Sequence, residues 1–155
     1  MLETIRAAED GVQDRLAESS LSLQIVALPD IGSFVADGKR LRQILFNLLS
    51  NAIGFSAPGQ TVTLAALRRG TDIVFKVSDQ GRGIPHDVIE HVFDRFHSNV
   101  IGARHRGVGL GLSIVKSFVE LHGGRVLIDS APGEGTTVTC IFPAQDEKLV
   151  IADRA

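Results

Sequence analysis

The feature that most constrains the fold is a set of four strand-like runs arranged in two pairs, each preceded by a helical segment. Residues 61–67 and 71–79 alternate apolar and polar side chains and are joined by "RRGT". Residues 125–130 and 136–143 form the second pair, joined by "APGEG". Short glycine-containing connections predict antiparallel hairpins, and strict alternation of strand and helix is absent, so a purely parallel sheet is disfavoured.

Three longer helices are expected to cover this sheet. The first is an opening helix within residues 1–20, the second follows a capping Asp37, and the third runs from about Gly109 to the Gly123–Gly124 pair. The second carries a continuous apolar stripe made of Leu41, Ile44, Leu45, Leu48, Leu49, Ala52 and Ile53. The pattern also includes strands at 21–28 and 34–37 and a short helix after Pro85, at 86–93. This order predicts an α+β fold, a two-layer α/β sandwich with a mixed sheet of about five strands and three main helices.

Length and composition set the class of protein. The chain has 155 residues, 44% hydrophobic content and a formal net charge of −2, which predicts one globular domain at 1–144 followed by a tail at 145–155. The charge balance argues against a nucleic-acid partner. No apolar run reaches the length of a membrane span and no signal peptide is recognised at the start, so we expect a cytoplasmic location. The single cysteine, Cys140, is expected to pack in the core.

Three glycines at alternate positions, Gly107, Gly109 and Gly111, precede the third helix. A helix start exposes unpaired N–H groups that attract anions, and glycine lets the backbone approach a phosphate closely. Arg104 and Arg106 stand just upstream as countercharges. The pattern matches neither a Rossmann fingerprint nor a Walker A loop. The alternative is a flexible loop that leads into a helix.

Two further groups of polar residues fall at informative positions. Gln43, Asn47 and Asn51 form a line along the second helix, which is either a solvent-facing edge or a set of amide oxygens suited to Mg²⁺. Asp79 shares the strand parity of its apolar neighbours, so its carboxylate is aimed at the core unless it only starts a turn. Thr136 shares the inward parity of the last strand and could complete the same pocket.

In order and spacing, four segments resemble the boxes of the ATP-binding catalytic domain of sensor histidine kinases. "NLLSNA" resembles the N box, "DQGRGI" the first glycine box, "FDRF" the F box and "GVGLGLSIVKSFVELHGG" the second glycine box. That domain belongs to the superfamily of gyrase, Hsp90, histidine kinase and MutL ATPases. The resemblance implies a Bergerat-type ATP-binding fold, and a narrower likeness points to the DivL-type branch of cell-division kinases.

The resemblance implies that ATP lies between the sheet and the helices, under a lid at 97–106. Asn51 would bind Mg²⁺, Asn47 would line the phosphate site and Asp79 would bind the adenine amine. The other residues implied at the nucleotide site are Phe55, Gly81, Gly83, Ile84, Phe96, Arg106, Gly107, Val108, Gly109, Leu110, Gly111, Leu112 and Thr136. Phe93 and Phe96 would anchor the lid, which is expected to be the most mobile part of the fold.

Two departures from the family pattern affect the functional reading. Gly54 stands where many of these kinases have a lysine that reaches toward the phosphates, although Phe55 keeps the aromatic residue that follows. None of the five histidines lies in a context resembling a phosphoacceptor helix. We therefore expect the phosphoacceptor histidine on a separate dimerisation domain, and no catalytic residue is assigned to this fragment.

The leading hypothesis is a bacterial two-component kinase domain that binds MgATP and donates its γ-phosphoryl group to that histidine. Its partners would be the dimerisation domain of the same protein and a response regulator, and the fragment itself would be monomeric. The alternative is a degenerate kinase-like module that signals through protein–protein contacts. A water-activating ATPase is disfavoured, because the amide of Asn47 cannot replace the glutamate that acts as the general base in gyrase-type enzymes.

Overall fold

A computed structural model describes residues 2–27, 38–94 and 108–143 of the chain. Its three longer helices are α1 (Leu2–Glu18), α2 (Gly38–Phe55) and α5 (Val108–Leu121), which confirms the expected number. Gly11 lies where α1 crosses α2, and an added Cβ there would be 3.3 Å from the ring of Phe46. The glycine that weakens the first helical pattern therefore permits close packing of two helices.

Among the described residues, five strands form one mixed sheet, as the sequence predicts, and their order is β1-β2-β3-β5-β4. The strands are β1 (Ser22–Ala27), β2 (Thr61–Arg69), β3 (Asp72–Asp79), β4 (Arg125–Ser130) and β5 (Thr136–Pro143). β1 pairs with β2 in parallel, and the other three pairings are antiparallel. Gly70 closes the β2–β3 hairpin with a φ of 61°, a conformation that favours glycine.

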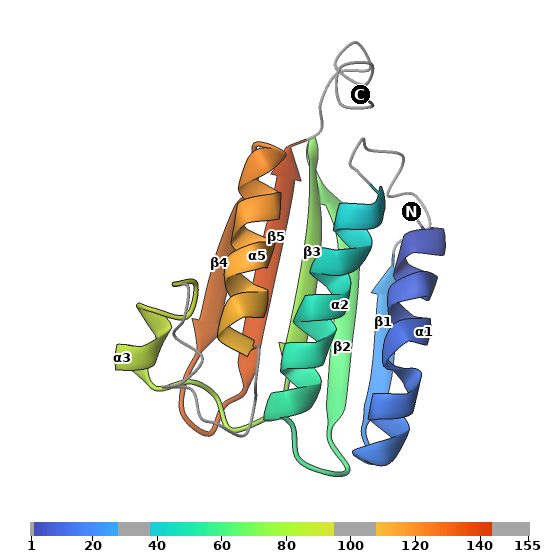
Figure 1. Ribbon diagram of the computed structural model, residues 1–155, viewed down its shortest axis with the longest axis vertical. Helices are drawn as coiled ribbons and strands as arrows, with labels where there is room; N and C mark the ends of the chain where they lie inside the picture. The colour runs from blue at the N-terminus through green and yellow to red at the C-terminus, as the bar shows by residue number, and fades with distance from the viewer. Residues whose placement is uncertain (1, 28–37, 95–107, 144–155) are drawn as a thin grey trace.

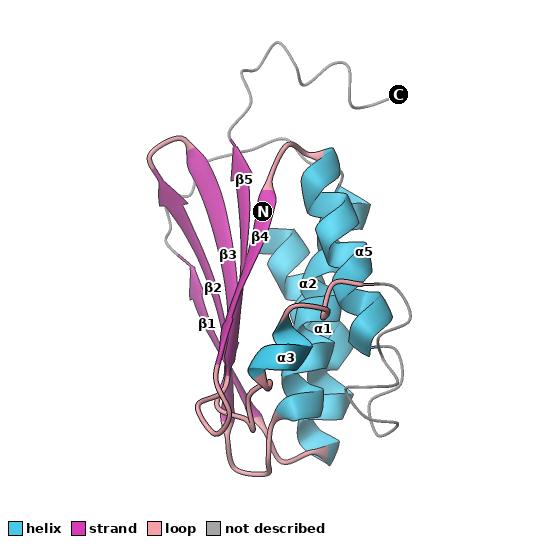
Figure 2. Ribbon diagram, turned by 90° about the vertical axis from the view of Figure 1, so that its left-hand side faces the viewer, coloured by secondary structure: helices cyan, strands magenta, loops and turns pink. Residues whose placement is uncertain are grey.

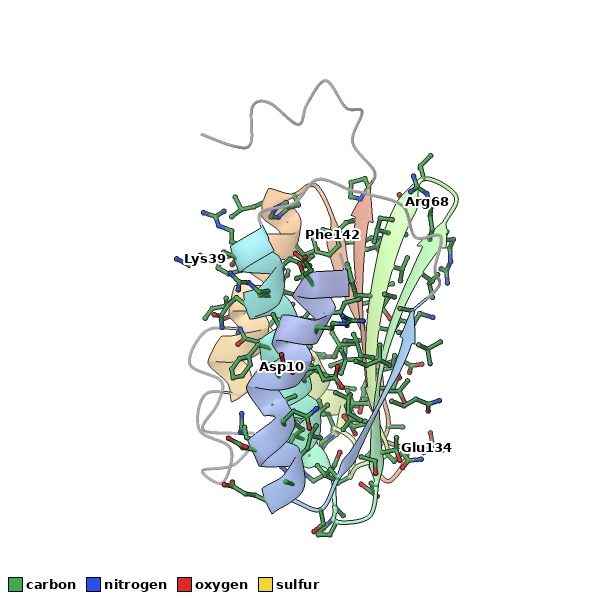
Figure 3. The ribbon with its side chains drawn as sticks, turned by 90° about the vertical axis from the view of Figure 1, so that its right-hand side faces the viewer. Asp10, Lys39, Arg68, Glu134 and Phe142 are labelled. Carbon is green, nitrogen blue, oxygen red and sulfur yellow. The ribbon has the colours of Figure 1, made fainter. Side chains whose placement is uncertain are left out.

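The helices cover one face of the sheet and give two layers (Figures 1 and 2). Alternate residues of each strand point toward the helices, so the period of two separates core from surface. Phe75 and Phe142 are buried in the core and meet edge to face, with ring centroids 5.9 Å apart. Figure 3 shows Phe142 between the layers, whereas Arg68 lies at the end of the hairpin.

The segment after Pro85 differs from its prediction. The helix expected over 86–93 is only α3 (His86–Ile89), and the chain continues in turns. Hydrogen bonds from His91 N to Val88 O and from Val92 N to Ile89 O span three residues rather than four, which tightens the chain into successive turns. The strand expected at 34–37 and the tail at 145–155 lie outside the described residues.

Cys140 is fully buried on β5, and this burial raises the pKa of its thiol to about 12. The side chain therefore packs in the core, as expected, and carries no thiolate at neutral pH. Within the described ranges, no helix is long and apolar enough to cross a membrane.

Candidate functional site

The candidate site lies at one end of the sandwich, where α2 and β3 finish and β5 begins (Figure 1). A small cavity of about 10 Å³ lies there between the sheet and the helices. Six of the predicted site residues line it: Asn51, Phe55, Asp79, Ile84, Leu112 and Thr136. Its remaining walls are core residues of α2, β3, β4 and β5. The N box and the two glycine boxes, which are far apart in the sequence, therefore converge on one buried cavity.

Asp79 is the ionisable group of this cavity. It is the last residue of β3, and only 9% of it is exposed. Desolvation raises the pKa of the carboxyl above its ordinary value of 3.8, and hydrogen bonds from the backbone N–H groups of Gly81 and Thr136 partly offset that effect. The bond from Gly81 N to Asp79 Oδ1 is 2.9 Å long. Asp79 is therefore an oriented acceptor on the inner face, as its strand parity predicts.

The loop after β3 and the β4–β5 turn are locked together beside Asp79. Gly83 has a φ of 71°, and a Cβ on it would lie 1.9 Å from the carbonyl oxygen of Ala131. The backbone N–H of Gly133 donates to the carbonyl oxygen of Arg82 at 2.8 Å. These two segments, which form two walls of the site, approach each other so closely that only glycine fits at position 83.

Ser130 joins the same two walls and was not predicted from the sequence. Its hydroxyl accepts a hydrogen bond from the backbone N–H of Ile84 at 2.8 Å and donates to the carbonyl oxygen of Gly135 at 3.0 Å. Its Oγ is also 2.8 Å from Oγ1 of Thr136. Ser130 is the only polar residue at an inward position of β4, after Val126 and Ile128, and that position is the signal that could have identified it.

The polar line on α2 reaches the start of α5. Gln43 Nε2 donates to Asn47 Oδ1 at 2.9 Å, and Asn47 Nδ2 donates to the carbonyl oxygen of Gly111 at 3.4 Å. Asn51 is 8% exposed, and its buried Nδ2 has no partner. A Cβ on Gly111 would lie 3.7 Å from Asn51 Oδ1, an ordinary van der Waals distance, so α5 begins directly beside this amide. The amide of Asn51 thus retains bonding capacity that the protein itself does not use.

Phe55 separates the small cavity from a larger one. The second cavity, about 300 Å³ in volume, is lined by Phe55, Arg82, Gly83, Ile84, Pro85, Val88 and Pro132. The guanidinium of Arg82 lies over the Phe55 ring, 5.1 Å from its centroid, in cation–π geometry. The backbone of Phe55 is fixed as well, because its carbonyl oxygen lies where a side chain on Gly81 would begin.

The predicted lid residues are only partly described. Phe96, Arg106 and Gly107, and the lid at 97–106, lie outside the described residues. Val108, Gly109 and Leu110 form the first turn of α5. Phe93 packs against the core, and Lys116 Nζ of α5 lies 5.7 Å from the centroid of its ring. Among the described residues, no group of three or more His, Cys, Asp and Glu side chains could hold a metal ion.

Comparison with known proteins identifies this arrangement. The profile of the family described as "Histidine kinase-, DNA gyrase B-, and HSP90-like ATPase" matches residues 36–146. The chain belongs to this family. It is a catalytic ATPase domain of the histidine kinase type, as the four boxes predict.

Among its relatives, the sensor protein DivL of Caulobacter vibrioides is 46% identical over 139 residues. That match covers 90% of this chain but 17% of DivL, so the chain spans about a sixth of this curated relative. The mycobacterial sensor histidine kinase MprB superimposes with a TM-score of 0.79 at 29% identity, over 94% of this chain and 95% of that one. Full-length ShkA in complex with AMPPNP gives 0.80 at 28% identity, over 93% of this chain and 30% of that one.

Proposed function

We propose that this histidine-kinase-type domain, within residues 1–144, binds MgATP and donates the γ-phosphoryl group to a histidine on a separate dimerisation domain. That domain and a response regulator are its proposed partners in two-component signalling. The observation that carries the proposal is the pairing of Asp79 and Thr136 across β3 and β5, at the edge of the buried cavity. ShkA, which was solved with AMPPNP, supports nucleotide binding by a domain of this fold.

The proposed base site uses the buried acceptor. An exocyclic amine of adenine would donate to the Asp79 carboxylate, which offsets the unfavourable burial of that group. Phe55 and Ile84 line the cavity and would contact the faces of the base. Burial of the Asp79 carboxylate is unfavourable in the free domain, and the hydrogen bond from the adenine amine would offset it in the complex.

The proposed phosphate site lies between α2 and the first turn of α5. Backbone N–H groups of Val108, Gly109 and Leu110 would contact phosphate oxygens at the positive end of the helix. The Oδ1 atom of Asn51 fits Mg²⁺ as a neutral oxygen ligand, because it faces the start of α5, 3.7 Å from where a Cβ on Gly111 would lie. Mg²⁺ keeps several waters and phosphate oxygens as its other ligands, and when bound it would neutralise phosphate charge.

The proposed reaction is transfer of the γ-phosphoryl group, to which this domain contributes by holding the nucleotide in position. Asn47 is held by bonds to Gln43 and Gly111, and its amide has no basic group to activate water. The domain would hold the triphosphate while the nucleophilic histidine is supplied from outside it. Hydrolysis of ATP by the isolated domain is accordingly expected to be slow.

One observation favours the second candidate function, a kinase-like module that signals without using nucleotide. The cavity beside Asp79 has a volume of about 10 Å³, which is about the space that one water needs. A purine base is much larger than one water, so it can bind there only if side chains that line the cavity, such as Phe55 or Ile84, move. In addition, Gly54 leaves the end of α2 without the positive charge that a lysine supplies at this position in many of these kinases.

Calorimetric titration with a non-hydrolysable ATP analogue, with and without Mg²⁺, separates the two functions. Micromolar binding that depends on Mg²⁺ supports the kinase function, and Asp79→Asn should then weaken it about 10- to 100-fold, the worth of a charged acceptor. Asp72→Asn, at the opposite end of the same strand, is the matched control. Absence of binding at millimolar analogue would favour the signalling module, and steady phosphate release from the chain alone would favour an ATPase.

The second test is phosphotransfer. The chain is mixed with labelled ATP and with the dimerisation domain of the same protein, and label on the histidine is followed. Transfer that is lost in Asp79→Asn and kept in Asp72→Asn supports the proposal. Tight nucleotide binding without transfer to that domain would contradict it.

A further inference from the structure

We propose that Ser130 is a positioning residue that turns the Thr136 hydroxyl hydrogen away from the cavity. Thr136 and Asp79 then present acceptors only, and the cavity selects a base with an amine over a base with a carbonyl at the same place. This inference rests on the proposed nucleotide function, and it assigns a selectivity role to a residue outside the family boxes.

The assignment follows from counting hydrogens. A serine hydroxyl has one hydrogen and two lone pairs. A carbonyl oxygen cannot donate, so the 3.0 Å contact between Ser130 Oγ and Gly135 O uses the serine's only hydrogen. The 2.8 Å contact between Ser130 Oγ and Thr136 Oγ1 must then use the hydrogen of Thr136. The opposite assignment would leave two bare oxygens facing each other at 3.0 Å.

The oxygen of Ser130 is fully used in this arrangement. One lone pair accepts from the backbone N–H of Ile84 at 2.8 Å, and the other accepts from Thr136. The carbonyl oxygen of Gly135 and the N–H of Ile84 belong to the two locked walls. The direction of the Thr136 hydroxyl is therefore set by backbone groups that cannot rotate.

The consequence concerns the ligand. Thr136 is 5% exposed and lines the cavity beside Asp79, its register partner on the neighbouring strand. With its hydrogen committed to Ser130, its remaining lone pairs can only accept hydrogen bonds from a ligand or a bridging water. Two acceptors suit the amine of adenine and repel the carbonyl oxygen of hypoxanthine. Without Ser130, the Thr136 hydrogen is free to turn toward the cavity and bond that carbonyl.

The test compares the affinities of the chain for ADP and IDP in Mg²⁺ by calorimetry, since neither nucleotide can donate a γ-phosphoryl group. The wild-type chain should prefer ADP. Ser130→Ala should lower the ADP-to-IDP preference by about three- to tenfold, the factor that one hydrogen bond supplies. Ser130→Thr, which keeps a hydroxyl, should restore the preference. Ser78→Ala, which breaks a 3.0 Å hydroxyl pair with Thr137 on the outer face, should leave it unchanged.

A double-mutant cycle separates positioning from mere structural support. In a Thr136→Val background, Ser130→Ala should leave the ADP-to-IDP preference unchanged, because no hydroxyl remains to be turned. An equal loss of preference in both backgrounds would overturn the inference, and so would an unchanged preference in Ser130→Ala. If the wild-type chain binds neither nucleotide, the proposed function itself fails. If it binds ADP selectively and Ser130→Ala has no effect, only the role of Ser130 fails.

Discussion

Asp79 on β3 and Thr136 on β5 are register partners, and the backbone N–H of Thr136 donates to the Asp79 carboxyl. The last residue pair of these two strands thus provides the carboxylate acceptor and one of the N–H groups that orient it. Most of the carboxyl's surroundings are nevertheless apolar, and burial is the larger influence on its pKa. The group lies in a place where folding alone would favour a neutral side chain.

The pH dependence of stability follows from this burial. Because the pKa of Asp79 is raised above 3.8 in the folded chain, the folded state holds that proton more firmly than the unfolded state. The resulting stabilisation is fully present below about pH 3.8 and is lost as the pH rises through the folded pKa. Asp79→Asn should therefore be more stable than wild type near neutral pH, by about 0.5–2 kcal/mol, and the gain should shrink in acid.

Urea unfolding of both chains across this pH range measures the difference. Asp72→Asn serves as the control, since Asp72 lies at the opposite, partly exposed end of β3. If the free energies of unfolding of wild type and Asp79→Asn differ by the same amount at every pH, the difference does not arise from ionisation of Asp79.

Asn51→Ala should weaken nucleotide binding about tenfold in Mg²⁺ and much less in EDTA, because only the metal-dependent part uses the amide oxygen. Titration of the same analogue in both buffers measures this ratio. Ser50→Ala is the matched control, since Ser50 precedes Asn51 on α2 and its Oγ also lacks a partner. Equal losses with and without Mg²⁺ would mean that Asn51 is not the metal ligand.

Gly54→Lys should raise the affinity for the ATP analogue by about two- to fivefold, which is typical of one exposed ion pair. Lysine is also the better helix former in the last turn of α2. The gain should diminish as salt is added, since the interaction is electrostatic. A neutral or negative effect would show that the phosphates do not pass close to position 54.

Gly81→Ala should destabilise the domain by about 1–3 kcal/mol through overpacking, since the new Cβ would lie 2.1 Å from the carbonyl oxygen of Phe55. Urea unfolding measures the change. Gly38→Ala, which meets nothing within 4 Å at the start of α2, is the control and should be neutral or slightly stabilising. Similar stability of the two variants would contradict the tight contact between the first glycine box and α2.

The sequence predicts the fold well because its periodic patterns are strong. A period of two places Asp79 and Thr136 on the inner face, and the structure confirms both positions. Ser130 is missed because its role depends on three groups supplied by other segments, and no local pattern encodes such contacts. The stacking of Arg82 over Phe55 is likewise a tertiary contact. The helix after Pro85 is predicted too long because its apolar residues continue beyond its last full turn.

The family match begins at residue 36, so it leaves out α1 and β1. Both nevertheless belong to the folded layers, since β1 pairs with β2 along its length and α1 buries Ile5, Val12 and Leu16 in the common core. β1 is the edge strand of the sheet, so a chain shortened to the matched segment would keep a strand edge but move it to β2. It would also expose the apolar surface that Ile5, Val12 and Leu16 of α1 cover, and a contiguous exposed apolar surface of this kind favours aggregation.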